Sequence, residues 1–179
     1  MFPIPVTKLV EGAKLCRDYA ITLATCASEN SKKYPVIAFS IMILALEEVG
    51  KAIFLLENFE KNNELSEAEW KRISGKKAHV KKLKIVHTAL IDPYSVLKPH
   101  ELSIRLKENK QYQHFEGIMG KDIYEIKLDC LYVDWKGDKS QWETPIQKKS
   151  YNVNEALKIL QTAIYLLSEK IRELQKHNI

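Results

Sequence analysis

One stretch of 13 residues restricts the possible folds more than any other part of this chain. From Tyr34 to Leu46 the sequence contains no charged residue, and residues 52–56 are again all apolar. Pro35 suits the first turn of a helix, and we expect this helix to run to Phe59 or Lys61. Its first three turns are apolar around the whole circumference, which is typical of a helix enclosed by others. The sequence therefore predicts a helical bundle with this helix at its centre.

Three further helices are predicted before residue 93. Apolar residues recur at spacings of three and four from about Thr7 to Ser28, and Thr7 is a suitable N-cap. Residues 66–69 (Ser-Glu-Ala-Glu) form a capping box that opens a short helix, and Gly75 weakens or breaks that helix. The next helix ends before Pro93 because proline disfavours helical geometry in the residue before it.

The last helix has the clearest pattern. It begins near Asn152 and carries two apolar edges. The first is a heptad-type seam of Val153, Leu157, Leu160, Ile164, Leu167, Ile171 and Leu174; the second consists of Ala156, Ala163 and Leu166. Both edges can be covered within one bundle, or one edge can pack against a second copy of the chain. We therefore predict a homodimer, and coverage of both edges within one bundle is the alternative interpretation.

Composition agrees with an all-α fold in a single domain, residues 1–179. Apolar residues make up 45% of the chain and charged residues 28%, with only 6 Gly and 6 Pro. The mixed pattern near residues 117–150 predicts a short irregular or extended insert, extended near residues 131–135. The N-terminus shows no signal-peptide pattern, and 13 uncharged residues are fewer than the roughly 20 that span a membrane. We therefore expect no membrane contact and a cytoplasmic location. The three cysteines, Cys16, Cys26 and Cys130, form no disulfide framework and are expected to be buried free thiols.

A polar interruption divides the apolar core helix. Glu47, Glu48, Gly50 and Lys51 lie between its two apolar parts. Glu48 has apolar neighbours one turn away, among them Leu44, so both are predicted to be buried. Lys51 is within reach of either acid, and Gly50 indicates the close approach of another backbone. The group is either a structural ion pair or the lining of a polar pocket in which Glu48 and Lys51 are candidate catalytic residues.

The positive charge of the chain is concentrated in one region. Between Trp70 and Ile91 there is no acid, and the net charge of the whole chain is only +5. This stretch contains Lys71, Arg72, Lys76, Lys77, Lys81, Lys82 and Lys84. Such a cluster is either a solvated helix face or the contact surface of a phosphate-rich partner such as RNA. The six lysines are the candidate nucleic-acid-binding residues.

His79 lies within the basic stretch and is a candidate general base. Nearby positive charge favours the neutral imidazole, which can accept a proton near pH 7. Arg72 is a candidate to stabilise the charge of a transition-state phosphate. Metal-binding and cofactor motifs such as H-E-x-x-H, paired C-x-x-C and a Gly-rich phosphate loop do not occur, so no metal or other cofactor is predicted.

Several short motifs occur in the order typical of one family. They are LALEEVGKA (44–52), AHVKKL (78–83) and LYVDW (131–135), followed by the long terminal helix. In these features the chain resembles the AbiV group of bacterial abortive-infection proteins, which are placed among the HEPN-like helical domains. The resemblance implies a HEPN-like up-and-down bundle, a role in phage defence and a homodimer. It also points to Glu48, Lys51, His79 and Lys82 as family positions.

Many HEPN domains are metal-independent ribonucleases whose motif is Arg, four to six residues, then His. Two stretches have this spacing: Arg72 to His79 and Arg172 to His177. Residues seven apart on one helix differ by about 20° and residues five apart by about 140°. The first pair is therefore favoured if one helix continues through Gly75.

Two functions of different classes follow from these observations. The first is phage defence by action on RNA or translation, with metal-independent endoribonuclease activity as the candidate reaction. The second is a non-catalytic helical protein that binds a phage or host protein. Cleavage of RNA by the purified protein in EDTA, and its dependence on His79, separates them.

Overall fold

In the computed structural model the chain is a helical bundle, as the apolar patterns predict. The structure describes residues 3–75, 78–92, 94–97, 134–136, 141–143 and 153–177. Its helices are α1 (Val6–Asn30), α2 (Pro35–Glu60), α3 (Glu67–Ser74), α4 (His79–Ile91) and α8 (Val153–His177). A short antiparallel hairpin, β1 (Asp134–Lys136) and β2 (Gln141–Glu143), pairs Trp135 with Trp142.

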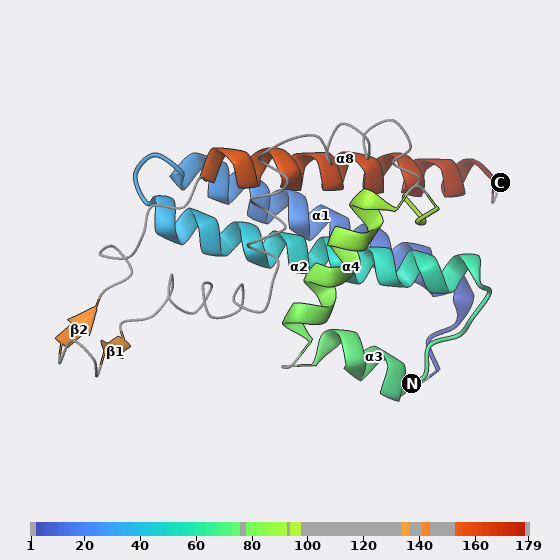
Figure 1. The fold of residues 1–179 in the computed structure, drawn as a ribbon. Coiled ribbons are helices and arrows are strands. Elements are labelled where there is room, and N and C mark those ends of the chain that lie inside the picture. The colour runs from blue at the N-terminus through green and yellow to red at the C-terminus, as the bar shows by residue number, and fades with distance from the viewer. Residues whose placement is uncertain are drawn as a thin grey trace.

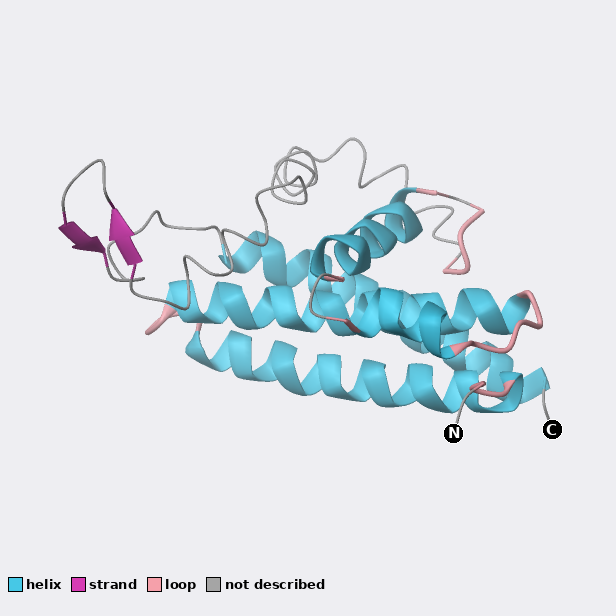
Figure 2. Cartoon of the chain, turned by 90° about the horizontal axis from the view of Figure 1, so that it is seen from below, coloured by secondary structure: helices cyan, strands magenta, loops and turns pink. Residues whose placement is uncertain are grey.

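Three long helices lie side by side and set the shape of the bundle. Figure 1 shows α1, α2 and α8 extended in roughly the same direction, with α8 running parallel to α2 and antiparallel to α1. α4 crosses α2 at a steep angle, and α3 leads into it. Figure 2 shows the same arrangement from below, with helices as the dominant structure.

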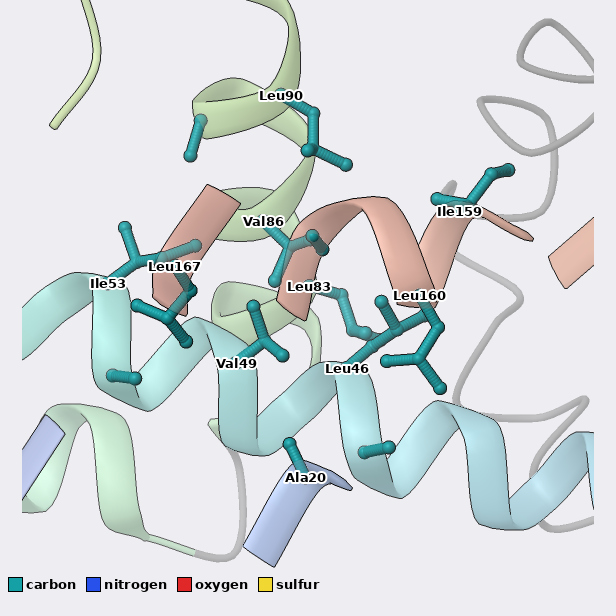
Figure 3. Close-up of a cluster of buried hydrophobic side chains, with 14 of the residues drawn as sticks. Ala20, Leu46, Val49, Ile53, Leu83, Val86, Leu90, Ile159, Leu160 and Leu167 are labelled. Atoms are coloured by element: carbon teal, nitrogen blue, oxygen red, sulfur yellow. The ribbon is translucent and has the colours of Figure 1, made fainter. Parts of the chain in front are cut away.

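α2 is the central helix, as predicted. It packs against α1, α4 and α8, and its core residues are completely or almost completely buried: Met42, Leu46, Val49, Ile53 and Leu56. Figure 3 shows Leu46, Val49 and Ile53 of α2 among side chains from the other helices, including Ala20, Leu83, Val86, Leu90, Leu160 and Leu167. Leu44, in contrast, is only half-buried, so its predicted place in the core is wrong.

The predicted helix starts agree with the structure for α3 but not for α1. The capping box is confirmed: the Ser66 hydroxyl accepts from the Glu69 backbone N–H, and the Glu69 carboxylate accepts from the Ser66 backbone N–H. The predicted N-cap at Thr7 is wrong, because α1 begins at Val6 with Pro5 at the cap position and no side-chain cap. The predicted start of the last helix at Asn152 lies outside the described residues.

The second apolar edge of α8 is covered within one chain. Ala156, Ala163 and Leu166 are all buried, together with most of the heptad-type seam. Of the two interpretations left open by the sequence, the structure therefore supports a bundle helix. The inference that this edge faces a partner is wrong. Because Leu166 is buried within the single chain, a charged residue at position 166 would disturb the fold of that chain.

The extended part of the predicted insert is present. The strands β1 and β2 occupy residues 134–136 and 141–143, and β1 includes residues 134–135 of the stretch where extension was predicted. The remainder of that insert lies outside the described residues. No helix in the described part of the chain is long and apolar enough to cross a membrane.

Candidate functional site

A buried carboxylate joins α2 to α4. The Glu47 side chain is 4% exposed, and its Oε2 lies 2.7 Å from Nδ1 of His79 and 2.8 Å from Nζ of Lys82. One carboxylate oxygen therefore contacts both groups. A buried carboxylate is stable only with such partners, since its desolvation is otherwise costly. We call Glu47, His79 and Lys82 the acid–base cluster.

The local sequence explains how α4 delivers two of these residues. α4 begins at His79, directly after Ala78. Lys82 follows three residues later, and side chains three apart lie on the same face of a helix. Both therefore point toward α2 from the first turn of α4, while Leu83 and Val86 bury the adjoining face.

Gly50 permits the close approach that the cluster needs. It lies one turn after Glu47 on α2, and a Cβ atom at this position would be 2.3 Å from the carbonyl oxygen of Lys82. Any larger residue would therefore collide with the backbone of α4. The prediction that another backbone packs closely against Gly50 is confirmed.

Glu48 occupies a different environment from the one predicted. It is partly exposed and forms an ion pair with Lys51, 2.5 Å between Oε2 and Nζ. Glu47, not Glu48, is the buried acid of the pair. Glu48 and Lys51 thus form a local ion pair on α2, one turn apart, while Glu47 holds the contacts to α4.

Arg72 and His79 do not lie on one continuous helix. α3 ends at Ser74, Gly75 is extended (φ −69°, ψ 162°), and α4 starts at His79. The argument that seven residues bring both side chains to the same face is therefore wrong. Arg72 is exposed near the end of α3.

The second Arg–His pair lies at the end of α8. Arg172 is exposed and forms an ion pair with Glu169. α8 extends to His177, whose side chain lies outside the described part of the molecule. The Arg172–His177 spacing therefore remains a sequence-based prediction.

The candidate nucleic-acid-binding lysines divide into three groups. Lys71, Lys81 and Lys84 are exposed; Lys71 pairs with Glu67, and Nζ of Lys81 lies 5.8 Å from the centre of the Phe54 ring. Lys82 is buried and bonded to Glu47, so the structure does not place it on the surface. Lys76 and Lys77 lie outside the described residues.

In the acid–base cluster, the Glu47 carboxylate can fix the orientation of the His79 ring. When neutral His79 donates its Nδ1 proton to Glu47, Nε2 is the basic nitrogen of the ring. The His79 side chain is 23% exposed, so the ring lies at the boundary between core and solvent. Within the described ranges, no group of three or more His, Cys, Asp or Glu side chains is arranged to hold a metal ion.

Comparison with known protein families identifies the family of this chain. The family model for AbiV, a HEPN-type family, matches residues 8–165, which include the whole acid–base cluster. The chain belongs to the AbiV family. This membership confirms the resemblance read from the sequence motifs and associates the protein with abortive infection and phage defence. Searches of curated proteins and of solved structures found no match.

Sequence reasoning found two of the three cluster residues and missed Glu47 as the one that connects them. His79 and Lys82 were singled out, but in different roles. The signal that could have identified Glu47 is Gly50 one turn later. A helix partner that approaches Gly50 closely must also approach the residue one turn before it on the same face.

Proposed function

We propose that this AbiV-family protein acts in phage defence by cleaving RNA, with His79 as the general base. The single observation that supports this most is the 2.7 Å contact between His79 Nδ1 and the buried Glu47 carboxylate. Carboxylates that bond one ring nitrogen fix the orientation and tautomer of a catalytic histidine. The surrounding stretch, free of acids from Trp70 to Ile91, suits a polyanionic substrate.

The proposed reaction needs only groups of the protein and the RNA. His79 removes the proton from a ribose 2′-hydroxyl, and the resulting O2′ attacks the adjacent phosphorus. The bond from phosphorus to O5′ breaks, and the leaving oxygen takes a proton from the imidazolium or from water. The products are a 2′,3′-cyclic phosphate and a 5′-hydroxyl. Exposed cations such as Arg72 are candidates to stabilise the phosphate charge.

The test is cleavage of labelled RNA by the purified protein in EDTA. We expect products with cyclic phosphate ends, and a loss of at least about 100-fold in rate for His79→Ala, the usual scale of general-base catalysis. Arg72→Ala should also slow the reaction. Arg172→Ala is the matched control for the second Arg–His pair and should leave the rate unchanged.

A folding control is necessary because His79 also joins α4 to α2. Each variant should be compared by circular dichroism and thermal unfolding before its activity is measured. A folded His79→Ala protein with unchanged cleavage would remove His79 from the reaction. Full activity in Arg72→Ala together with loss in Arg172→Ala would move the reaction to the α8 pair.

A second candidate function is a non-catalytic interaction protein that binds a phage or host protein. The observation that favours it is the exposure of large apolar side chains on α1, Leu15 at 64% and Tyr19 at 55%. If the protein is non-catalytic, the acid–base cluster is only a structural connection between α2 and α4. Absence of any RNA cleavage by a folded protein would favour this candidate.

A further inference from the structure

One oxygen of Glu47 serves two basic groups at the same time. Its Oε2 lies 2.7 Å from Nδ1 of His79 and 2.8 Å from Nζ of Lys82. Since both distances end on the same atom, the two nitrogens lie no further apart than the sum of the two. That is within the roughly 4–6 Å at which one charge changes the protonation of a neighbouring group. A positive charge on the His79 ring would therefore form beside the Lys82 ammonium.

Burial makes Lys82 the constant positive charge of the acid–base cluster. The side chains of Glu47 and Lys82 are both less than a tenth exposed, whereas the His79 ring lies at the boundary with solvent. A buried carboxylate stays ionised only beside a compensating charge. A lysine ammonium bonded to a carboxylate keeps its proton throughout the neutral pH range, but a histidine near pH 7 can gain or lose one.

The net charge of the cluster differs between the two states of the His79 ring. With a neutral ring, the Glu47 carboxylate and the Lys82 ammonium cancel. With an imidazolium, the cluster carries one uncompensated positive charge between α2 and α4. Burial disfavours such a charge, so the presence of Lys82 favours the neutral ring. Without the lysine charge the preference reverses, because the imidazolium would then neutralise the carboxylate.

We propose that Lys82 is a positioning residue that, through Glu47, keeps the His79 ring neutral with its one proton on Nδ1. A carboxylate held ionised by Lys82 can only accept hydrogen bonds, so the neutral ring donates from Nδ1. Nε2 then carries the lone pair that a general base uses. The charge state of the ring does not depend on RNA, whereas its effect on cleavage rests on the proposed function.

The other charged groups on the helices that contact α4 are paired, distant or open to solvent. On α2, Glu48 pairs with Lys51, and both lie close enough to the Cys16 thiol of α1 to affect its pKa. Glu57 and Glu60 are ten or more residues further along α2, at least about 15 Å from Glu47. The titratable and charged groups of α3 and of the rest of α4 are exposed or only partly buried: Glu67, Glu69, Lys71, Arg72, Lys81, Lys84 and His87. Water screens such charges more than it screens a buried ammonium.

The first test is 15N NMR of the histidine side chains in the intact protein. The His79 signals are assigned by their absence in His79→Gln. At pH 7 we expect a neutral ring with the proton on Nδ1. A doubly protonated His79 ring at this pH, or a neutral ring with the proton on Nε2, would overturn the proposal. This measurement needs no change at Lys82, so it decides the proposal even where a Lys82 variant does not fold.

The second test follows the protonation of the His79 ring with pH in variants of its neighbours. Lys82→Met removes the charge and keeps most of the side-chain volume, and the ring should stay protonated to a pH about one unit higher or more. Glu47→Gln should shift the titration in the opposite direction, and Lys82→Arg should keep that of the parent. Lys81→Met, an equal charge change at the exposed neighbouring residue, is the matched control and should leave it unchanged. An unshifted titration in folded Lys82→Met, or shifts of the same sign in Lys82→Met and Glu47→Gln, would contradict the proposal.

The third test separates this role from the RNA chemistry. If His79 is the general base, the cleavage rate follows the neutral fraction of its ring. Lys82→Met should then cleave about tenfold more slowly than the parent at pH 6 and approach the parent rate near pH 8.5, while Lys82→Arg follows the parent at both. Absence of cleavage in every folded protein would remove the proposed function, and the NMR results would still decide the role of Lys82. Cleavage by Lys82→Met with the pH profile of the parent, despite a shifted ring titration, would overturn the effect of Lys82 on the reaction.

Discussion

Gly50 of α2 and Lys82 of α4 touch through their backbones. A Cβ atom on residue 50 would lie 2.3 Å from the Lys82 carbonyl oxygen, far inside van der Waals contact. The carbonyl belongs to a helix and cannot move away as a side chain could. This contact brings the first turn of α4 so close to α2 that His79 and Lys82 both reach Glu47.

The substitution Gly50→Ala should therefore destabilise the protein. Alanine has the higher helix propensity, by about 1 kcal/mol, but the added methyl group must displace α4. We expect a net loss of about 1–3 kcal/mol, as for other overpacked sites. Urea unfolding followed by circular dichroism measures it.

Gly12→Ala provides the matched control. Here the added Cβ would meet only the end of a side chain, Cδ1 of Leu55 at 3.2 Å. A side-chain end can shift by a few tenths of an ångström, so we expect a change below about 1 kcal/mol in either direction. Equal stability of the two variants would show that α2 and α4 do not approach as closely as the structure places them.

The Glu47–Lys82 contact should behave as a coupled buried pair. Both side chains are less than a tenth exposed. Glu47→Leu alone leaves the buried Lys82 ammonium without its carboxylate and should cost about 3–5 kcal/mol. In Glu47→Leu with Lys82→Met the second change should recover part of this loss. A double-mutant cycle by urea unfolding should give a coupling free energy of about 0.5–3 kcal/mol, and strictly additive effects would contradict a direct interaction.

The helices were predictable because their signals are local. The capping box at Ser66, the proline at the start of α2 and the apolar spacing of α1 and α8 all act within one or two turns. Which of the two acids, Glu47 or Glu48, is buried against α4 was not predictable. α2 is apolar around its circumference, so its sequence does not fix which side faces α4, and the partners of Glu47 lie 32 and 35 residues away along the chain.

The basic stretch illustrates the same limit. Charge counting treated its lysines as equivalent, but Lys82 is buried and Lys81, its neighbour, is exposed. Only the position of α4 against α2 separates the two. Likewise, the glycine at position 75 indicated a weak point in a helix from Arg72 to His79. The extended backbone at Gly75 places these two residues on different helices.

Glu57 should make stability depend on pH. Partial burial raises the pKa of its carboxyl group, Lys61 opposes this and Glu60 adds to it. The folded protein thus holds this proton more tightly than the unfolded chain, so ionisation of Glu57 opposes folding as pH rises. Glu57→Gln should raise the melting temperature relative to the parent at pH 7 and lose this advantage near pH 3. Glu64→Gln, exposed after α2, is the control and should show no such difference.

The two described cysteines should differ in reactivity. Burial raises the pKa of the Cys16 thiol to about 11, whereas Cys26 is exposed, contrary to the prediction that both are buried. Because the thiolate is the nucleophile, iodoacetamide at pH 8 should modify Cys26 at least about tenfold faster than Cys16. Peptide mass spectrometry in a Cys130→Ser background measures both rates, and comparable rates would contradict the packing of Cys16.

RNA binding should depend on the exposed lysines of α4, Lys81 and Lys84, and on the two lysines that precede α4 in the sequence. Bound phosphates release counterions, so the logarithm of the affinity should fall linearly with the logarithm of the salt concentration, by about 0.7 per phosphate contact for single strands. Lys81→Glu with Lys84→Glu, and separately Lys76→Glu with Lys77→Glu, should weaken binding and reduce this slope. Lys32→Glu with Lys33→Glu, an equal charge change at the exposed turn between α1 and α2, is the control. If all three double variants weaken binding equally, net charge alone attracts the RNA, and the basic stretch beside His79 is not its binding surface.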